Sequence, residues 1–245
     1  MIDALLNFDF IRYSLISGLL IGFIAPLIGA FIVVRRLSLI ADALSHVTLG
    51  GISFGMFLLT IIPVFSVINP MWFGILFAVI GALLIEKLRT SFSNYQEIAI
   101  PIIMSAGIAL SAIFISLADG FNQEIVGLLF GSISAVNISD LTTIIIITII
   151  VLIFIVLFYK ELFILSFDEE YSKVIGIPKW IQFLFIVIVA MVISASMRVV
   201  GILLVSALIT LPIAISMRIT KGFKQLIALS TVSYTHLTLP TIYSV

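Results

Sequence analysis

The chain of 245 residues contains no cysteine and very little charge. The absence of cysteine excludes disulfides, thiolate metal sites and thiol nucleophiles. Only 10% of the residues are charged, whereas soluble domains average about 25% because water must solvate their surface. Hydrophobic residues make up 62% of the chain, and the mean hydropathy is +1.38. We therefore expect lipid to be the solvent for much of the surface.

Several motifs of enzymes and nucleotide-binding proteins are also absent. The sequence has no G-x-x-x-x-G-K-[ST] loop, no H-E-x-x-H and no G-x-S-x-G, so a P-loop ATPase site and the common hydrolase sites are not predicted. The formal net charge is zero and no basic stripe suggests nucleic acid. We expect the chain itself not to be an enzyme.

Seven apolar segments are about as long as a helix needs to cross the hydrocarbon of a bilayer, roughly 20 residues. They predict an all-α, polytopic membrane protein, because only helices satisfy their backbone inside such single segments. A further apolar stretch, residues 124–137, is too short to cross and is predicted to form a short re-entrant-type helix. The predicted spans are residues 12–34, 41–62, 71–87, 98–118, 139–158, 180–197 and 199–217.

The basic residues predict the orientation. With the N-terminus outside, ten Lys and Arg residues fall inside and only Arg12 and Arg198 fall outside, which is the bias expected of a multi-pass protein of the plasma membrane. The ten are Arg35, Arg36, Lys87, Arg89, Lys160, Lys173, Lys179, Arg218, Lys221 and Lys224.

We expect one transmembrane domain over residues 1–232, with a cytoplasmic loop at about 159–179. Gln225 to Val232 begins like an eighth span, but the sequence then becomes polar and contains Pro240. Residues 233–245 are therefore predicted to be a non-native tail that truncates a further helix.

Asp42 and His46 are the clearest ionisable pair inside a predicted span. Their i, i+4 spacing places them on one helix face, about 6 Å apart. A carboxylate and an imidazole suit a borderline divalent cation, and Ser45 adds an oxygen nearby. A closed zinc site needs four ligands, but a transport path must release its ion. The competing interpretation, a His–Asp hydrogen bond that only locks helix packing, is equally consistent with the pair alone.

Other charged residues lie near the predicted span ends. Glu124 and Asp140 face outside in this topology and are candidates for an outer part of the pathway, although solvation at the interface also explains them. Arg198, at an outside turn, is expected to pair with a lipid headgroup or a carboxylate.

Three segments in order resemble one family, the permease subunits of ABC importers for zinc and manganese. Ile32–Val47 is similar to the family's arginine-flanked D-x-x-S-H signature, and Arg198–Pro212 resembles its G-x-L-L-V-x-A-L-L-x-x-P helix. The segment from Phe167 to Gly176 resembles the cytoplasmic coupling segment. The likeness extends from about Phe10 to about Val232.

The resemblance implies a homodimer with two cytoplasmic ATP-binding subunits and an extracytoplasmic metal-binding protein. It implies transported Zn²⁺ or Mn²⁺, with zinc favoured, and no stably bound cofactor. It assigns the metal pathway to Asp42 and His46. It also implies that residues 167–178 contact the ATPase; the coupling residues are then Asp168, Glu169, Glu170 and Gly176.

Three alternatives use the same residues differently. An ion-coupled secondary carrier would build its site on residues 124–137, but such carriers carry two matching broken helices and only one is predicted here. An ABC permease for chelated iron would not need a small Asp/His pair. A membrane scaffold would leave that pair to packing alone.

Overall fold

The computed structural model describes residues 9–62, 68–92, 95–118, 123–131 and 136–243, and within these residues the chain is helical and contains no strand. Seven helices are long and apolar enough to cross a membrane, so the predicted all-α polytopic fold is confirmed. They are α2 (Asp9–Val34), α3 (Ile40–Ile61), α4 (Met71–Ser91), α5 (Ala99–Leu117), α7 (Ile138–Phe167), α9 (Lys179–Val200) and α10 (Ile202–Ile219).

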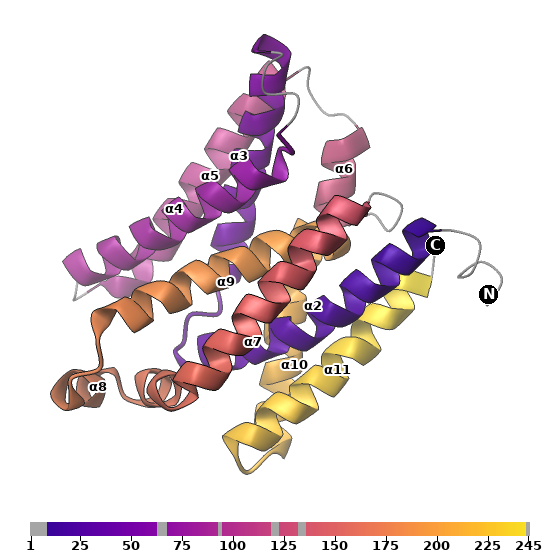
Figure 1. Cartoon of the computed structure of the whole chain (residues 1–245). Helices are drawn as coiled ribbons and strands as arrows, with labels where there is room; N and C mark the ends of the chain where they lie inside the picture. The colour runs from indigo at the N-terminus through magenta and orange to yellow at the C-terminus, as the bar shows by residue number, and fades with distance from the viewer. Residues whose placement is uncertain (1–8, 63–67, 93–94, 119–122, 132–135, 244–245) are drawn as a thin grey trace.

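The helices form two groups that meet at α9 (Figure 1). One group consists of α3, α4 and α5, and the other contains α2, α7 and α11 (Phe223–Tyr243). Helix α9 contacts α3 and α4 on one side and α2 and α7 on the other. The aromatic core beside α9 includes Phe31 and Phe185, both fully buried, whose ring centroids lie 6.2 Å apart edge to face.

The spans alternate in direction, and this gives the bundle two distinct ends. At one end, α2, α4, α7 and α10 finish and α8 (Glu169–Ile175) lies; we call it the α8 end. The opposite end carries the short helix α6 (Gln123–Phe130), and we call it the α6 end. The ten Lys and Arg residues predicted to lie inside are at or near helix termini of the α8 end, whereas Arg12 and Arg198 are near termini of the α6 end.

Helix α7 differs from its predicted extent. The predicted span ends at residue 158, but the helix continues to Phe167. Only Phe158 leaves helical geometry (φ −113°, ψ 21°), and its ring packs edge to face on Trp180 at 5.2 Å. The helix persists because Leu162 and Leu165 beyond this break are buried. The prediction of a loop over residues 159–167 was therefore wrong.

The short helix predicted within residues 124–137 is present as α6, eight residues long; residues 132–135 lie outside the described part of the chain. The last helix, α11, packs against α2, and Tyr234 is fully buried. Proline removes a backbone donor and clashes with the preceding turn, yet α11 continues past Pro240 to Tyr243. The origin of residues 233–245 stays a prediction.

Candidate metal pathway and coupling surface

The structure brings Asp42 and His46 together in the first two turns of α3. His46 Nε2 lies 3.9 Å from Asp42 Oδ1, and the side chains are 25% and 36% exposed, respectively. This distance is too long for a hydrogen bond, so the pair is not locked as the packing interpretation requires. Donor atoms that each lie about 2.1 Å from one ion are at most about 4.2 Å apart. One cation can therefore contact both side chains.

The backbone beneath this pair is tightly held. Ser111 Oγ on α5 lies 3.1 Å from the carbonyl oxygen of His46 and 2.7 Å from that of Gly107, so its one hydrogen is shared between α3 and its own helix. Gly107, also on α5, lies so close that a Cβ added there would be 2.9 Å from the backbone nitrogen of Val47. The small residue allows the two helices to approach closely. The backbone of α3 is thus fixed while the Asp42 and His46 side chains stay open.

Ser45 is placed differently from its two neighbours. It is fully buried, and its hydroxyl donates to the carbonyl oxygen of Ala41 at 2.8 Å. The hydroxyl therefore does not lie on the open face with Asp42 and His46. A contribution of Ser45 to the pathway stays a prediction.

Among the described residues, no three His, Cys, Asp or Glu side chains gather closely enough to hold a metal ion. The Asp42–His46 pair of one chain thus offers two of the four ligands of a closed zinc site. Such an incomplete donor set suits a passing ion rather than a stored one.

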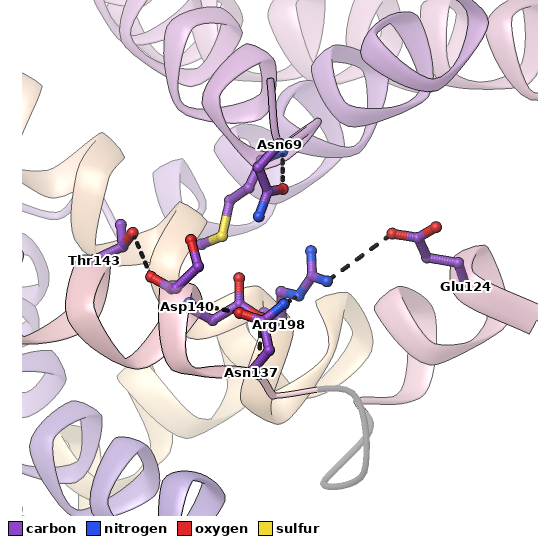
Figure 2. A network of polar contacts seen from close by, with 8 residues as sticks. Asn69, Glu124, Asn137, Asp140, Thr143 and Arg198 are labelled. Carbon is purple, nitrogen blue, oxygen red and sulfur yellow. Dashed lines mark hydrogen bonds and ion pairs between the residues drawn. The ribbon is translucent and has the colours of Figure 1, made fainter. Parts of the chain in front are cut away.

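A second polar network lies at the α6 end and is centred on Arg198 (Figure 2). Arg198 Nε lies 3.1 Å from Asp140 Oδ2, and Arg198 Nη2 lies 3.9 Å from Glu124 Oε1. Asp140 also forms a capping box with Asn137 at the start of α7: the Asp140 nitrogen donates to Asn137 Oδ1 at 2.9 Å, and the Asn137 nitrogen donates to Asp140 Oδ2 at 3.2 Å. Arg198 on α9 thereby ties α6 to the start of α7.

The two candidates for the outer pathway differ in access. The Asp140 side chain is 1% exposed and faces Arg198, whereas the Glu124 side chain is 47% exposed. Glu124 is thus open to an ion at this end, whereas Asp140 is covered unless its pair with Arg198 opens. The outer-pathway roles of both residues stay predictions. The expected pairing of Arg198 with a carboxylate is present.

At the α8 end, Asp168 and Gly176 define a short surface helix. Asp168 is the N-cap of α8, and its Oδ1 accepts from the Tyr171 nitrogen at 2.8 Å. Gly176 ends the helix in the left-handed conformation (φ 81°), which glycine adopts without the strain of other residues. The segment that resembles the family's coupling segment therefore contains a capped helix.

Helix α8 has seven residues, too few to span a membrane, and carries exposed apolar side chains. Tyr171, Val174 and Ile175 are 53%, 83% and 51% exposed, and Glu170 is exposed beside them. The side chain of Glu169, another predicted coupling residue, lies outside the described part of the chain. Exposed apolar residues rimmed by charge are typical of a contact with another protein or with the membrane surface.

Two contacts between distant segments were not predicted from the sequence. Gln182 Nε2 on α9 donates to Glu86 Oε1 on α4, and Thr48 Oγ1 on α3 lies 3.1 Å from Ser194 Oγ on α9. The i, i+3 spacing of Glu86 and Arg89 could have indicated their ion pair, but no local signal indicates Gln182.

Comparison with known proteins identifies the family. The family model described as "ABC 3 transport family" matches residues 7–244. The "Probable metal transport system membrane protein" of Treponema pallidum is 31% identical over 221 residues, which cover 89% of this chain and 79% of that protein. The "Manganese transport system membrane protein MntC" of Listeria monocytogenes is 31% identical over 231 residues, or 94% of this chain and 79% of the relative.

Solved structures agree with this result. The structure titled "PsaBC from Streptococcus pneumoniae in complex with Fab" superposes with a TM-score of 0.80 at 30% identity, covering 96% of this chain and 82% of that one. An inward-facing structure of a putative metal-chelate type ABC transporter, at 19% identity and a TM-score of 0.64, shares the fold. Because the family model spans nearly the whole sequence and the fold agrees over the same length, the chain belongs to the ABC 3 transport family, as a membrane-spanning permease subunit.

Proposed function

We propose that this chain forms the transmembrane path of an ATP-driven importer that moves a divalent transition-metal ion, Mn²⁺ or Zn²⁺, into the cell. The observation that carries the proposal is the Asp42–His46 pair: a carboxylate and an imidazole 3.9 Å apart, partly open, on a helix of an apolar bundle. Ionisable groups in such a bundle are costly, so they call for a function.

The donor chemistry fits both metals. Carboxylate oxygen suits manganese and imidazole nitrogen suits zinc. The relatives from Listeria monocytogenes and Streptococcus gordonii are named for manganese transport or import, and these names support manganese as the first metal to test. The preference for zinc drawn from the sequence stays a prediction.

A homodimer would complete the donor set. If the partly open faces of α3 from two copies meet on a symmetry axis, they supply two carboxylates and two imidazoles. Four donors satisfy the coordination that one chain leaves incomplete. Their separation on two movable subunits would allow the ion to be released again.

Partner subunits would supply the energy and deliver the metal. We place the α8 end in the cytoplasm because it carries ten of the twelve Lys and Arg residues. The capped helix α8, with its exposed Tyr171, Val174 and Ile175, is then the surface that contacts an ATP-binding subunit. The α6 end faces outward, where an extracytoplasmic metal-binding protein would deliver the ion.

Transport by the reconstituted complex tests the proposal. We expect ATP-dependent uptake of Mn²⁺ or Zn²⁺ into proteoliposomes that contain this chain with its ATP-binding and metal-binding partners. Asp42→Asn and His46→Gln, which keep side-chain size but remove the donor charge or nitrogen, should each lower uptake at least about tenfold, the lower range seen when metal-site interactions are removed.

Arg12→Gln is a suitable control, because Arg12 pairs with Asp9 at an exposed site far along α2 from its end at Val34. Wild-type uptake in the Asp42→Asn and His46→Gln variants would refute the pathway role. Uptake of an iron chelate, but of neither free metal, would replace the proposed substrate.

A further inference from the structure

We infer that Thr48 and Ser194 are positioning residues through which α9 holds the metal-bearing helix α3 during transport. The inference rests on the proposed function, since it gives a role to a contact that touches no ion. In this proposal, α9 transmits the movement of α8 to α3, so that the three helices move together.

The contact joins two helices that are far apart in the sequence. Thr48 Oγ1 and Ser194 Oγ lie 3.1 Å apart, and both side chains are buried, with 0% and 1% exposed. Each hydroxyl also lies within bonding distance of a carbonyl oxygen in its own helix, Leu44 for Thr48 (2.7 Å) and Ala190 for Ser194 (2.8 Å).

Two hydroxyl hydrogens serve these three contacts. Whichever hydroxyl donates across the interface, the other still donates to its own helix. The contact between α3 and α9 is therefore compatible with both donor assignments, and in each of them one hydroxyl donates across the interface instead of to its own helix.

Thr48 acts on α3 from behind the metal pair. It follows His46 by two residues, which is about 200° around a helix, so the two side chains point to opposite sides. His46 is partly open whereas Thr48 is fully buried. Thr48 therefore holds α3 in position against α9 but does not contact the ion.

Helix α9 is well placed to transmit motion. It begins at Lys179, directly after Gly176 and Pro178 close the connection from α8. Near this start, Gln182 donates to Glu86 on α4. At the far end of α9, Arg198 contacts Asp140 on α7. Between these anchors, Ser194 contacts Thr48 on the helix that carries Asp42 and His46.

The reconstituted complex provides the first test, with metal uptake and ATP hydrolysis measured in the same vesicles. Thr48→Val and Ser194→Ala should each lower the metal moved per ATP hydrolysed about fivefold, while basal ATP hydrolysis stays within about twofold of wild type. A single interhelical hydrogen bond adds little to the stability of a membrane protein, so the variants should purify and unfold like wild type. Thr48→Ser, which keeps the hydroxyl, should retain coupling.

Ser196→Ala is the matched control. Ser196 lies two residues after Ser194 on α9 and is also fully buried. Its hydroxyl donates to the carbonyl oxygen of Val192 at 2.7 Å, within its own helix. The Thr48→Val, Ser194→Ala double variant should be no worse than either single variant, because both remove the same bond. An equal loss in Ser196→Ala, additive losses in the double variant, or full coupling in both single variants would each overturn the inference.

A covalent version of the contact gives an independent test that does not depend on losing a hydrogen bond. The chain has no cysteine, so a Thr48→Cys, Ser194→Cys variant carries the only two thiols, and an organic disulfide can oxidise them to an interhelical bond. If α3 and α9 move as one unit, the oxidised form should transport at least as well per ATP as the reduced form. Inhibition by oxidation that a reductant reverses would show that the two helices must separate, and would overturn the inference.

The outcomes separate the two levels of the argument. If wild type takes up metal and Asp42→Asn abolishes uptake, but the Thr48 and Ser194 variants stay coupled, only this inference fails. If the wild-type complex takes up no metal at all, the proposed function is wrong, and this inference, which depends on it, is wrong as well.

Discussion

At the scale of single residues, the same kind of ion pair has different consequences at two places near the α6 end. Arg12 and Asp9 form an exposed pair on one helix, with side chains 48% and 65% accessible. Arg198 and Asp140 form a pair between two helices, with side chains 11% and 1% accessible. An exposed pair contributes at most about 1 kcal/mol because water and salt screen it, whereas breaking a buried pair leaves an uncompensated charge.

This contrast predicts the stability of Arg198 variants. Arg198→Met should lower the free energy of unfolding by roughly 3–5 kcal/mol, because the Asp140 carboxylate then remains buried without its cation. Adding Asp140→Asn should recover part of the loss, because the remaining group is neutral. Arg12→Met should change stability by less than about 1 kcal/mol. Thermal unfolding of the detergent-purified variants measures all three; an Arg198→Met protein as stable as Arg12→Met would contradict the assigned role of the pair.

Residue-scale prediction from the sequence works where the partners are local. Asp42 and His46 lie one turn apart on one helix, so their spacing alone placed them on a common face. The partners Thr48 and Ser194 are separated by 146 positions and Glu86 and Gln182 by 96. Their contacts depend on how the helices pack, and neither spacing nor composition carries that information.

At the scale of elements, hydropathy found all seven spans but not the length of α7. Lys160 and Glu161 are charged, and the burial of Leu162 and Leu165 on the same turns depends on packing against other helices, which the local sequence does not reveal. Helix α8 was more predictable, since Asp168 and Gly176 carry the N-cap and C-cap signals themselves.

The glycine at the end of α8 offers a sharp test of coupling. A Cβ at Gly176 or at Gly222 would meet no atom within 4 Å, but only Gly176 has a positive φ, +81°. Gly176→Ala should therefore strain the α8 cap by about 1–2 kcal/mol without a clash. We expect metal uptake to fall about 5- to 30-fold, the change in an equilibrium that this energy corresponds to, while ATP hydrolysis continues. Gly222→Ala should leave coupling intact.

Charge reversal at Glu169 and Glu170 should also uncouple transport from ATP hydrolysis, because it inverts the charge of the first turn of α8 and leaves Asp168 and Gly176, which cap the helix, unchanged. The measurement is again uptake per ATP, together with co-purification of the ATP-binding subunit. Normal coupling in both the Gly176→Ala and the charge-reversed proteins would remove α8 from the ATPase contact.

At the scale of the whole molecule, the count of spans and the charge asymmetry followed from the sequence because the bilayer imposes both. The sequence did not predict that α9 joins the two helix groups, because α9 is apolar on several sides and side-chain packing determines which helices it contacts. The path of α11 was also missed, because its polar residues and Pro240 indicated a break while its burial against α2 depends on the fold.

The absence of cysteine makes the orientation directly measurable, because wild type gives no background labelling. Gln123 is exposed at the start of α6, and Gly222 is exposed between α10 and α11 at the α8 end, outside the proposed ATPase contact, so a thiol at either position should react. If the basic α8 end is cytoplasmic, a membrane-impermeant maleimide should label Gln123→Cys in intact cells and Gly222→Cys only in inverted vesicles. The opposite pattern would show that the α8 end lies outside the cell. The proposed ATPase contact could then not reach a cytoplasmic ATP-binding subunit, and the proposed import mechanism would be wrong.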